Sequence, residues 1–195
     1  MHLLWADPTW HPRASDPTFG GWLVALGYVM AAVLSFAAML AYRAAPATGE
    51  PADDTRRILG ILWGVVAVLL LGVVLVRQLD LGALVVQHLR SLARHHDWYE
   101  NRRRYQKLFI AVVLLGGVAA LAAALVALRR VRREAFPVVA VMVVIIVLGL
   151  VSSTSLHAID RVLYRGAGWL KRSVELLASA SVCLLAIRAR ARARC

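Results

Sequence analysis

Residues 58–76 read ILGILWGVVAVLLLGVVLV, a stretch that contains no charged side chain. As an α-helix rising 1.5 Å per residue, it is about 28 Å long, close to the roughly 30 Å thickness of the hydrocarbon core of a bilayer. A surface helix of a soluble domain has a polar face, and this stretch has none. It therefore predicts a transmembrane helix.

Four further apolar blocks of similar length lie before and after this stretch, and charged or polar segments separate them. We expect an all-α fold, a polytopic membrane helix bundle that occupies residues 21–187 and has five transmembrane helices. The expected spans are residues 21–42, 58–76, 108–128, 136–156 and 169–187.

The composition of the whole chain agrees with this fold class. Of the 195 residues, 61% are hydrophobic and 17% are charged, whereas a soluble domain is about 45–50% apolar and roughly a quarter charged. This difference excludes a soluble enzyme domain, a disordered tail and a small secreted module. The two cysteines, Cys183 and Cys195, form no C-x-x-C pair, so neither a disulfide framework nor a cysteine zinc site is indicated.

Residues 77–107 have a different pattern, in which apolar side chains recur at three- and four-residue spacing among arginines and histidines. This pattern predicts an amphipathic helix that lies in the membrane interface. Trp98 and Tyr99 within it are residue types that settle at the depth of the headgroups. At the two ends of the chain, residues 1–20 form a polar segment and residues 188–195 form a basic tail.

The orientation is predicted from the 23 Lys and Arg residues, which outnumber the 11 Asp and Glu residues. Counted by segment, the basic residues divide almost evenly between the two sides. Dense charge close to a span end has the most topological weight, and it occurs in residues 129–133 and 188–194. We therefore expect residues 1–20 outside and residues 188–195 in the cytoplasm. Five spans then place all six histidines on the outer side.

The same arginines bear on partners and source. The preference of positive charge for the cytoplasmic ends of spans and its attraction to anionic headgroups account for these arginines, so membrane lipids are expected as partners. No aromatic residues that could stack on bases are interleaved with the basic tail, so nucleic acid is not expected as a partner. The preference for arginine and alanine over lysine is typical of a GC-rich bacterial genome. We expect a multi-pass protein of the bacterial inner membrane.

Three local predictions concern helix ends and one charged residue. Asp54 or Thr55 is expected to cap the second span by accepting a hydrogen bond from its first-turn amides. Pro137 is expected in the first turn of the fourth span, where a proline removes no helical hydrogen bond. Glu175 follows Lys171 by four positions and Arg172 by three, and we expect it to pair with one of these two side chains.

Small residues predict where helices approach one another closely. Gly60 and Gly64 form a G-x-x-x-G pattern in the second span, and Gly116, Ala120 and Ala124 form a similar stripe in the third. Such small side chains allow two helix backbones to come close together. Both patterns predict tight helix packing and no ligand.

One stripe of polar residues follows the fourth span. Ser153, His157 and Asp160 share a face if that helix continues past the membrane edge. A hydrogen bond between His157 and Asp160 would fix the tautomer of the imidazole, as metal and catalytic sites require. The alternative is a polar helix end in water, with Asp160 paired to Arg161 or Arg165.

A second cluster, His95-His96-Asp97, offers residue types that bind metals. Adjacent residues on a helix point about 100° apart, and a metal site needs three or four converging ligands. A solvated interfacial segment is therefore the simpler interpretation. A metal site would need ligands from both segments, with His95, His96, His157 and Asp160 as the candidates.

Four pieces of the chain carry a family resemblance. They are DPTFGGW at 16–22, QLDL at 78–81, WY at 98–99 followed by Arg102, Arg103 and Gln106, and SLHAID at 155–160. With them the chain resembles an uncharacterised family of small bacterial multi-pass inner-membrane proteins over most of its length, which implies a membrane fold and no particular reaction. Ser155, His157 and Asp160 also resemble part of the zinc-surrounding set of the alkaline ceramidase-type membrane hydrolases. The last span lacks the H-x-x-x-H pair of that superfamily.

These observations favour a binding or accessory protein, and they leave open whether the protein is an enzyme. We expect a polar pocket on the outer face that binds a lipid headgroup or a partner membrane protein, with no cofactor. The expected binding residues are Asp80, His95, His96, Trp98, Tyr99 and Arg103. The alternative is a metal-dependent hydrolase acting on a lipid-like substrate, with zinc as its cofactor. Its candidate residues are Ser153, His157 and Asp160, together with one or two of His11, His95 and His96.

Overall fold

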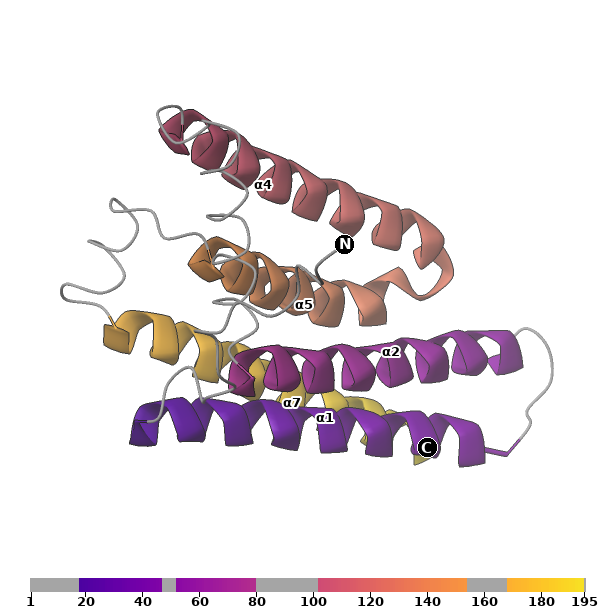
Figure 1. Ribbon diagram of the computed structural model, residues 1–195. Helices are drawn as coiled ribbons and strands as arrows, with labels where there is room; N and C mark the ends of the chain where they lie inside the picture. The colour runs from indigo at the N-terminus through magenta and orange to yellow at the C-terminus, as the bar shows by residue number, and fades with distance from the viewer. Residues whose placement is uncertain (1–17, 47–51, 80–101, 154–167, 195) are drawn as a thin grey trace, which may run out of the picture.

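The computed structural model describes residues 18–46, 52–79, 102–153 and 168–194, and every regular element within these ranges is a helix (Figure 1). The all-α prediction is therefore confirmed, with no strand in the described ranges. The elements are α1 (Phe19–Ala44), α2 (Ala52–Gln78), α4 (Arg102–Ala127), the short 3-10 helix η2 (Arg129–Val131), α5 (Arg132–Ser153) and α7 (Gly168–Arg194).

Successive described α-helices run in opposite directions (Figure 1). The helices α1, α4 and α7 begin at one end of the molecule, and α2 and α5 begin at the other. α1 packs most extensively against α2 and α7, α5 packs on α7 and α2, and α4 packs mainly on α5. The centre of the molecule is thus the trio α1, α2 and α7, and α4 lies farthest from it.

Glycines set the close contact between α1 and α2. A Cβ atom added to Gly64 would lie 2.8 Å from Sδ of Met39, and one added to Gly60 would lie 3.5 Å from Cβ of Tyr42. Any larger side chain at Gly64 would have to displace the methionine. The prediction that this G-x-x-x-G pattern brings two helices together is confirmed.

On its other side, α1 approaches α7 through a second pair of small residues. A Cβ atom added to Gly27 would lie 2.8 Å from Oγ of Ser179. The Ser179 hydroxyl is buried but satisfied, because it donates to the carbonyl oxygen of Leu176 at 2.9 Å. At the start of α1, the side chain of Thr18 caps the helix by accepting from the amide of Gly21 at 3.3 Å.

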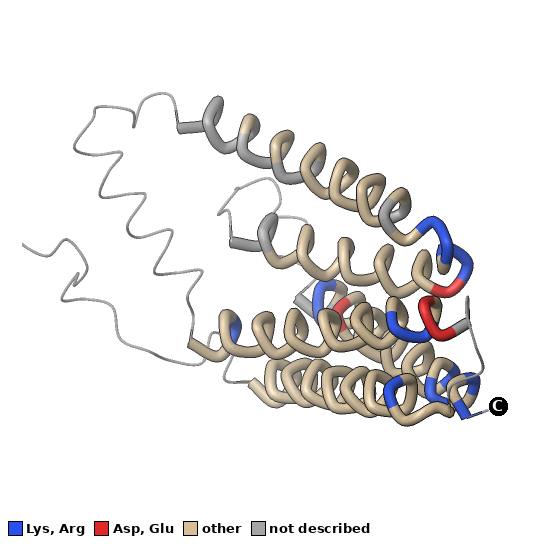
Figure 2. Tube along the Cα trace, turned by 90° about the vertical axis from the view of Figure 1, so that its right-hand side faces the viewer, with Lys and Arg blue, Asp and Glu red and all other residues tan. Residues whose placement is uncertain are grey.

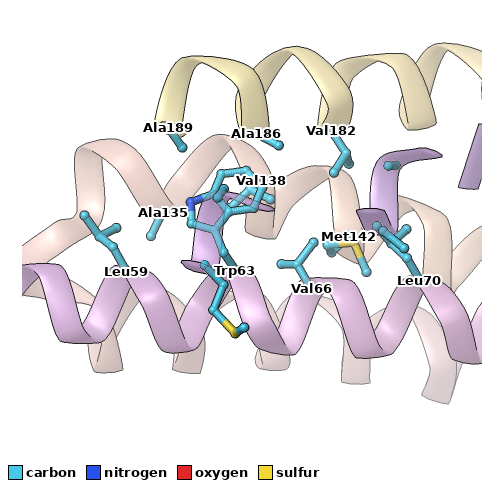
Figure 3. Packing of buried hydrophobic residues seen from close by; sticks show 14 of the residues in the cluster. Leu59, Trp63, Val66, Leu70, Ala135, Val138, Met142, Val182, Ala186 and Ala189 are labelled. Atoms are coloured by element: carbon cyan, nitrogen blue, oxygen red, sulfur yellow. The ribbon is translucent and has the colours of Figure 1, made fainter. Parts of the chain in front are cut away.

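Trp63 joins α2 to the helices α5 and α7 (Figure 3). Its side chain is buried, and it points from α2 toward Val138 of α5 and toward the α7 residues Ala186 and Ala189. The two alanines leave room for the indole ring, which a larger α7 side chain would occupy. Trp63, Val138, Ala186 and Ala189 all belong to the buried apolar cluster of the bundle.

α4 is the least enclosed helix, with Leu115 and Val126 exposed by 70% and 71%. It contacts α5 at Gly117, where an added Cβ atom would lie 2.9 Å from Cγ2 of Val147. At Gly116 an added Cβ atom would meet nothing within 4 Å. The predicted packing stripe through Gly116 is therefore wrong by one residue, because the rotation of the helix decides which of two adjacent glycines faces the neighbour.

α2 begins before its apolar stretch does. The predicted span starts at Ile58, whereas the helix starts at Ala52. Asp53 and Asp54 consequently lie in its first turn, where the positive end of the helix dipole favours carboxylates. The prediction that Asp54 or Thr55 caps the helix from outside is wrong.

Three further helix ends differ from prediction. α7 continues to Arg194, so the predicted tail is helical, as alternating alanine and arginine favour. α4 begins at Arg102, so the end of the predicted interfacial segment 77–107 belongs to that helix. α5 begins at Arg132, which places Pro137 in its second turn instead of its first.

Two of the described helices are long and apolar enough to cross a membrane. They are α1 and the stretch Asp53–Gln78 of α2. A shorter apolar helical stretch, Leu115–Ala124, lies within α4.

Candidate functional site

One end of the molecule is strongly basic, and we call it the arginine-rich end (Figure 2). There α1, α4 and α7 finish, and α2 and α5 begin (Figure 1). Three described carboxylates, Asp53, Asp54 and Glu134, accompany a much larger number of arginines. The arginines are Arg43, Arg56, Arg57, Arg129, Arg130, Arg132, Arg133, Arg188, Arg190, Arg192 and Arg194.

The carboxylates connect the helices at this end. Oε2 of Glu134 accepts a hydrogen bond from the Tyr42 hydroxyl at 3.4 Å, and Oε1 lies 3.8 Å from Nη1 of Arg192, so α1, α5 and α7 are linked. Nη1 of Arg130 lies 3.7 Å from Oδ2 of Asp54, which links η2 to α2. Solvent reaches both ion pairs, so they position the helices more than they stabilise them.

Two open hollows lie at the arginine-rich end. The first, the α1–α2 hollow, has a volume of about 410 Å³ and is lined by Tyr42, Arg43, Ala45, Asp53, Arg56, Arg57 and Ile61. The second, the η2 hollow, has a volume of about 430 Å³ and is lined by Thr55, Arg129, Arg130, Val131, Arg132, Arg133 and Glu134. Arginine is the commonest residue type in both linings.

This arrangement suits the binding of anions. Each guanidinium is a planar fork of N–H donors that matches a phosphate or a carboxylate. Within the described ranges, no group of three or more His, Cys, Asp or Glu side chains is placed to hold a metal ion.

A second charged feature lies toward the opposite end of the bundle. Nη1 of Arg77, in the last turn of α2, lies 2.9 Å from Oε1 and 3.0 Å from Oε2 of Glu175 in α7. The side chains are only 15% and 7% exposed, so this is a buried ion pair. Tyr28 of α1 is also buried and lies close enough to interact electrostatically with both charges. The pair therefore joins α2 to α7 beside α1.

This partner of Glu175 was not predicted from the sequence. The predicted partners were Lys171 and Arg172 on the same helix, and Arg77 was assigned to the start of the interfacial segment 77–107. A signal was present, because Arg77 and Glu175 are opposite charges that each stand next to a long apolar stretch. Pairing them requires placing the end of α2 and the start of α7 at the same end of the bundle, which spacing along one helix does not reveal.

Most of the predicted site residues lie outside the described ranges. This applies to the binding candidates in 80–101 and to the catalytic and metal candidates in 154–167. Ser153 is the last residue of α5 and Arg103 lies in the first turn of α4. The residues outside are Asp80, His95, His96, Trp98 and Tyr99, then His157 and Asp160, and also His11.

Comparison of the chain with models of known families, with curated proteins and with solved structures gives no match. The resemblances proposed from short motifs therefore stay predictions.

Proposed function

We propose that the protein is a five-helix integral protein of a bacterial inner membrane and that it works as a binding or accessory protein. The observation that carries the membrane part is the apolar outward surface of α1 and α2. Within the most apolar stretch of 18 residues in each helix, 44% of the residues of α1 and 33% of those of α2 are buried. A core helix of a soluble protein is mostly buried, whereas lipid covers apolar side chains that face outward.

The other helices support the number of spans. α4 is uncharged from Leu108 to its end, and α5 is uncharged from Ala135 to its end. Each stretch has about 20 residues and a length of roughly 30 Å, enough to cross a bilayer core. α7 carries Glu175, but its pairing with Arg77 compensates the charge, as is usual for charged groups inside membrane proteins.

The arrangement of charge supports an orientation with the arginine-rich end in the cytoplasm and the start of α1 outside. Positive charge close to span ends favours the cytoplasmic side. At the opposite end, Arg77 is held in the buried pair with Glu175. The other basic residues in the described helices at that end are Arg102, Arg103, Arg104, Lys107, Lys171 and Arg172.

The binding role rests on the chemistry of the two faces. In this orientation, the arginine-lined hollows face the inner leaflet, where anionic lipids attract basic groups. On the outer side, Asp80, His95, His96, Trp98, Tyr99 and Arg103 are proposed to contact a lipid headgroup or a partner membrane protein.

Reporter fusions test the number of spans and the orientation together. Alkaline phosphatase is active only outside the cytoplasm, and green fluorescent protein reports the inside. Fusions after residues 50, 131 and 195 should fluoresce, and fusions after residues 90 and 160 should be active phosphatases. Release of the full chain from membranes by alkaline carbonate, or phosphatase activity at residue 195, would contradict the proposal.

The binding role has its own test. The full chain, purified in a mild detergent, should retain a lipid or a protein partner through gel filtration at a fixed ratio that mass spectrometry detects. The control is the same preparation after extensive delipidation and salt washing. Protein that is free of bound lipid and partner before any washing would argue against a binding role.

A further inference from the structure

We propose that the η2 hollow is a binding site for the phosphodiester headgroup of an anionic phospholipid. The hollow lies between the first turn of α2, which supplies Thr55, and the η2–α5 junction, which supplies the arginines. The proposal rests on the proposed function, because it requires the arginine-rich end to lie at the surface of a membrane.

The first argument is unbalanced charge. Four of the five residues 129–133 are arginines. Arg129 and Arg130 lie in η2, and Arg132 and Arg133 begin α5 directly after it. Residues three apart along a helix are neighbours, so Arg129 and Arg132, and likewise Arg130 and Arg133, form like-charged pairs that repel. An anion between the two pairs would relieve that repulsion.

The protein itself supplies little compensation. Arg130 has Asp54 at 3.7 Å, and the Glu134 carboxylate is already engaged by Tyr42 and Arg192. Within the described part of the chain, the structure gives no hydrogen bond or ion pair to the other three arginines of the hollow. Their guanidinium groups are solvent-exposed and have donors to offer to a ligand.

The second argument is size and lining. A volume of about 430 Å³ falls within the usual range of ligand sites, about 300–1,000 Å³. A guanidinium group can donate two parallel hydrogen bonds to phosphate oxygens, which a lysine ammonium group does not provide. The lining therefore suits a phosphodiester better than an isolated small anion such as chloride.

The third argument identifies a lipid as the source of the phosphodiester. The apolar stretches of the two adjoining helices start directly beyond the hollow, at Ile58 in α2 and at Ala135 in α5. Phe136, two residues after Glu134, is about half exposed. A headgroup in the hollow would place its acyl chains along this outward apolar surface. A free phosphate would leave that surface unused.

The experiment compares lipids and variants by native mass spectrometry of the full chain in detergent. The protein is titrated with phosphatidylglycerol and with phosphatidylcholine that have the same acyl chains. The double variant R129Q/R132Q removes two arginines of the hollow. The matched control R190Q/R194Q removes two arginines of α7 at the same end that do not line either hollow.

The wild type and the control should bind one phosphatidylglycerol at least tenfold more tightly than phosphatidylcholine. R129Q/R132Q should bind it about tenfold more weakly than the wild type, as expected for the loss of a charge-assisted contact. The control should change by less than about twofold. A second pair, R129Q/R133Q, should behave like the first and guards against a folding defect in one variant.

Three outcomes would overturn the proposal. They are equal binding of the two lipids, equal loss in the hollow and control variants, and displacement of the lipid by equimolar glycerol 3-phosphate, which would make the ligand a soluble phosphate. None of them affects the reporter fusions. Failure of this site is therefore distinguishable from failure of the five-span proposal.

Discussion

Replacing Arg77 by leucine should destabilise the protein more than replacing Glu175 by leucine. Each change leaves one charge of the buried pair without its partner, which costs about 3–5 kcal/mol when the remaining charge stays buried. The two remaining charges differ in how easily they reach water. Glu175 lies in the third turn of α7 with a side chain only 7% exposed and a short stem. Arg77 lies in the last turn of α2 and has a long stem.

The expected magnitudes follow from this difference. In R77L the Glu175 carboxylate stays buried, so we expect a loss of about 3 kcal/mol in the free energy of unfolding. In E175L the long Arg77 side chain can extend beyond the end of α2 into a polar environment, so we expect a loss of about 1–2 kcal/mol. The double variant R77L/E175L leaves no charge behind and should lie within about 1 kcal/mol of the wild type.

Equilibrium unfolding in mixed micelles with increasing dodecyl sulfate, followed by tryptophan fluorescence, measures these differences. R57L, which removes an exposed arginine near the start of α2, is the matched control and should change stability by less than about 0.5 kcal/mol. The reasoning predicts strong non-additivity between Arg77 and Glu175. If the losses of the two single variants add up in the double variant, the pair makes no favourable interaction and the reasoning is refuted.

Three further predictions use the same unfolding assay. G64L should lose about 1–3 kcal/mol because its side chain must displace Met39, whereas G72L, where an added Cβ atom meets nothing within 4 Å, should change little; equal losses would contradict the close α1–α2 contact. W63A should lose about 3–5 kcal/mol because it empties the contact of α2 with α5 and α7, and a loss below 1 kcal/mol would mean that this contact is loose. S35A should gain about 1 kcal/mol, since the buried Ser35 hydroxyl has no hydrogen-bond partner among the described residues; a loss would reveal a partner.

The apolar stretches were predictable from the sequence, and the helix ends were not. A stretch such as 58–76 is recognised because it lacks charge, which reflects what lipid tolerates. A helix ends for different reasons, namely caps and backbone propensity. Arginine and alanine are good helix formers, so α2, α4 and α7 continue through charged residues beyond the predicted spans. Hydropathy therefore gives the length of the apolar stretch, which is shorter than the helix.

The spacing of small residues predicted close packing correctly only where the helix is rotated so that those residues face a neighbouring helix. Gly60 and Gly64 face α1, as their spacing predicted, but in α4 the packed glycine is Gly117 and not its neighbour Gly116. Every residue of an apolar helix is compatible with facing lipid, so the sequence of α4 contains no polar face that would define its rotation.

The candidate sites show the same limit. The sequence predicts site chemistry among the histidines and explains the arginines as topological anchors. Their density in 129–133 was visible, but a hollow requires the 3-10 turn at η2 and the adjacent first turn of α2. Neither follows from counting charges. The part of the proposed site that the sequence shows is the short connection with four arginines at 129–133.

The Arg77–Glu175 pair suggests how lone charges in a membrane protein can be matched. A single charge beside a long apolar stretch is unfavourable unless an opposite charge lies at the same depth on another helix. In a bundle of alternating helices, the end of α2 and the start of α7 lie at the same end (Figure 1). Depth therefore makes Arg77 a candidate partner for Glu175 before any packing is known, and it identifies a cross-helix contact that spacing along one helix does not.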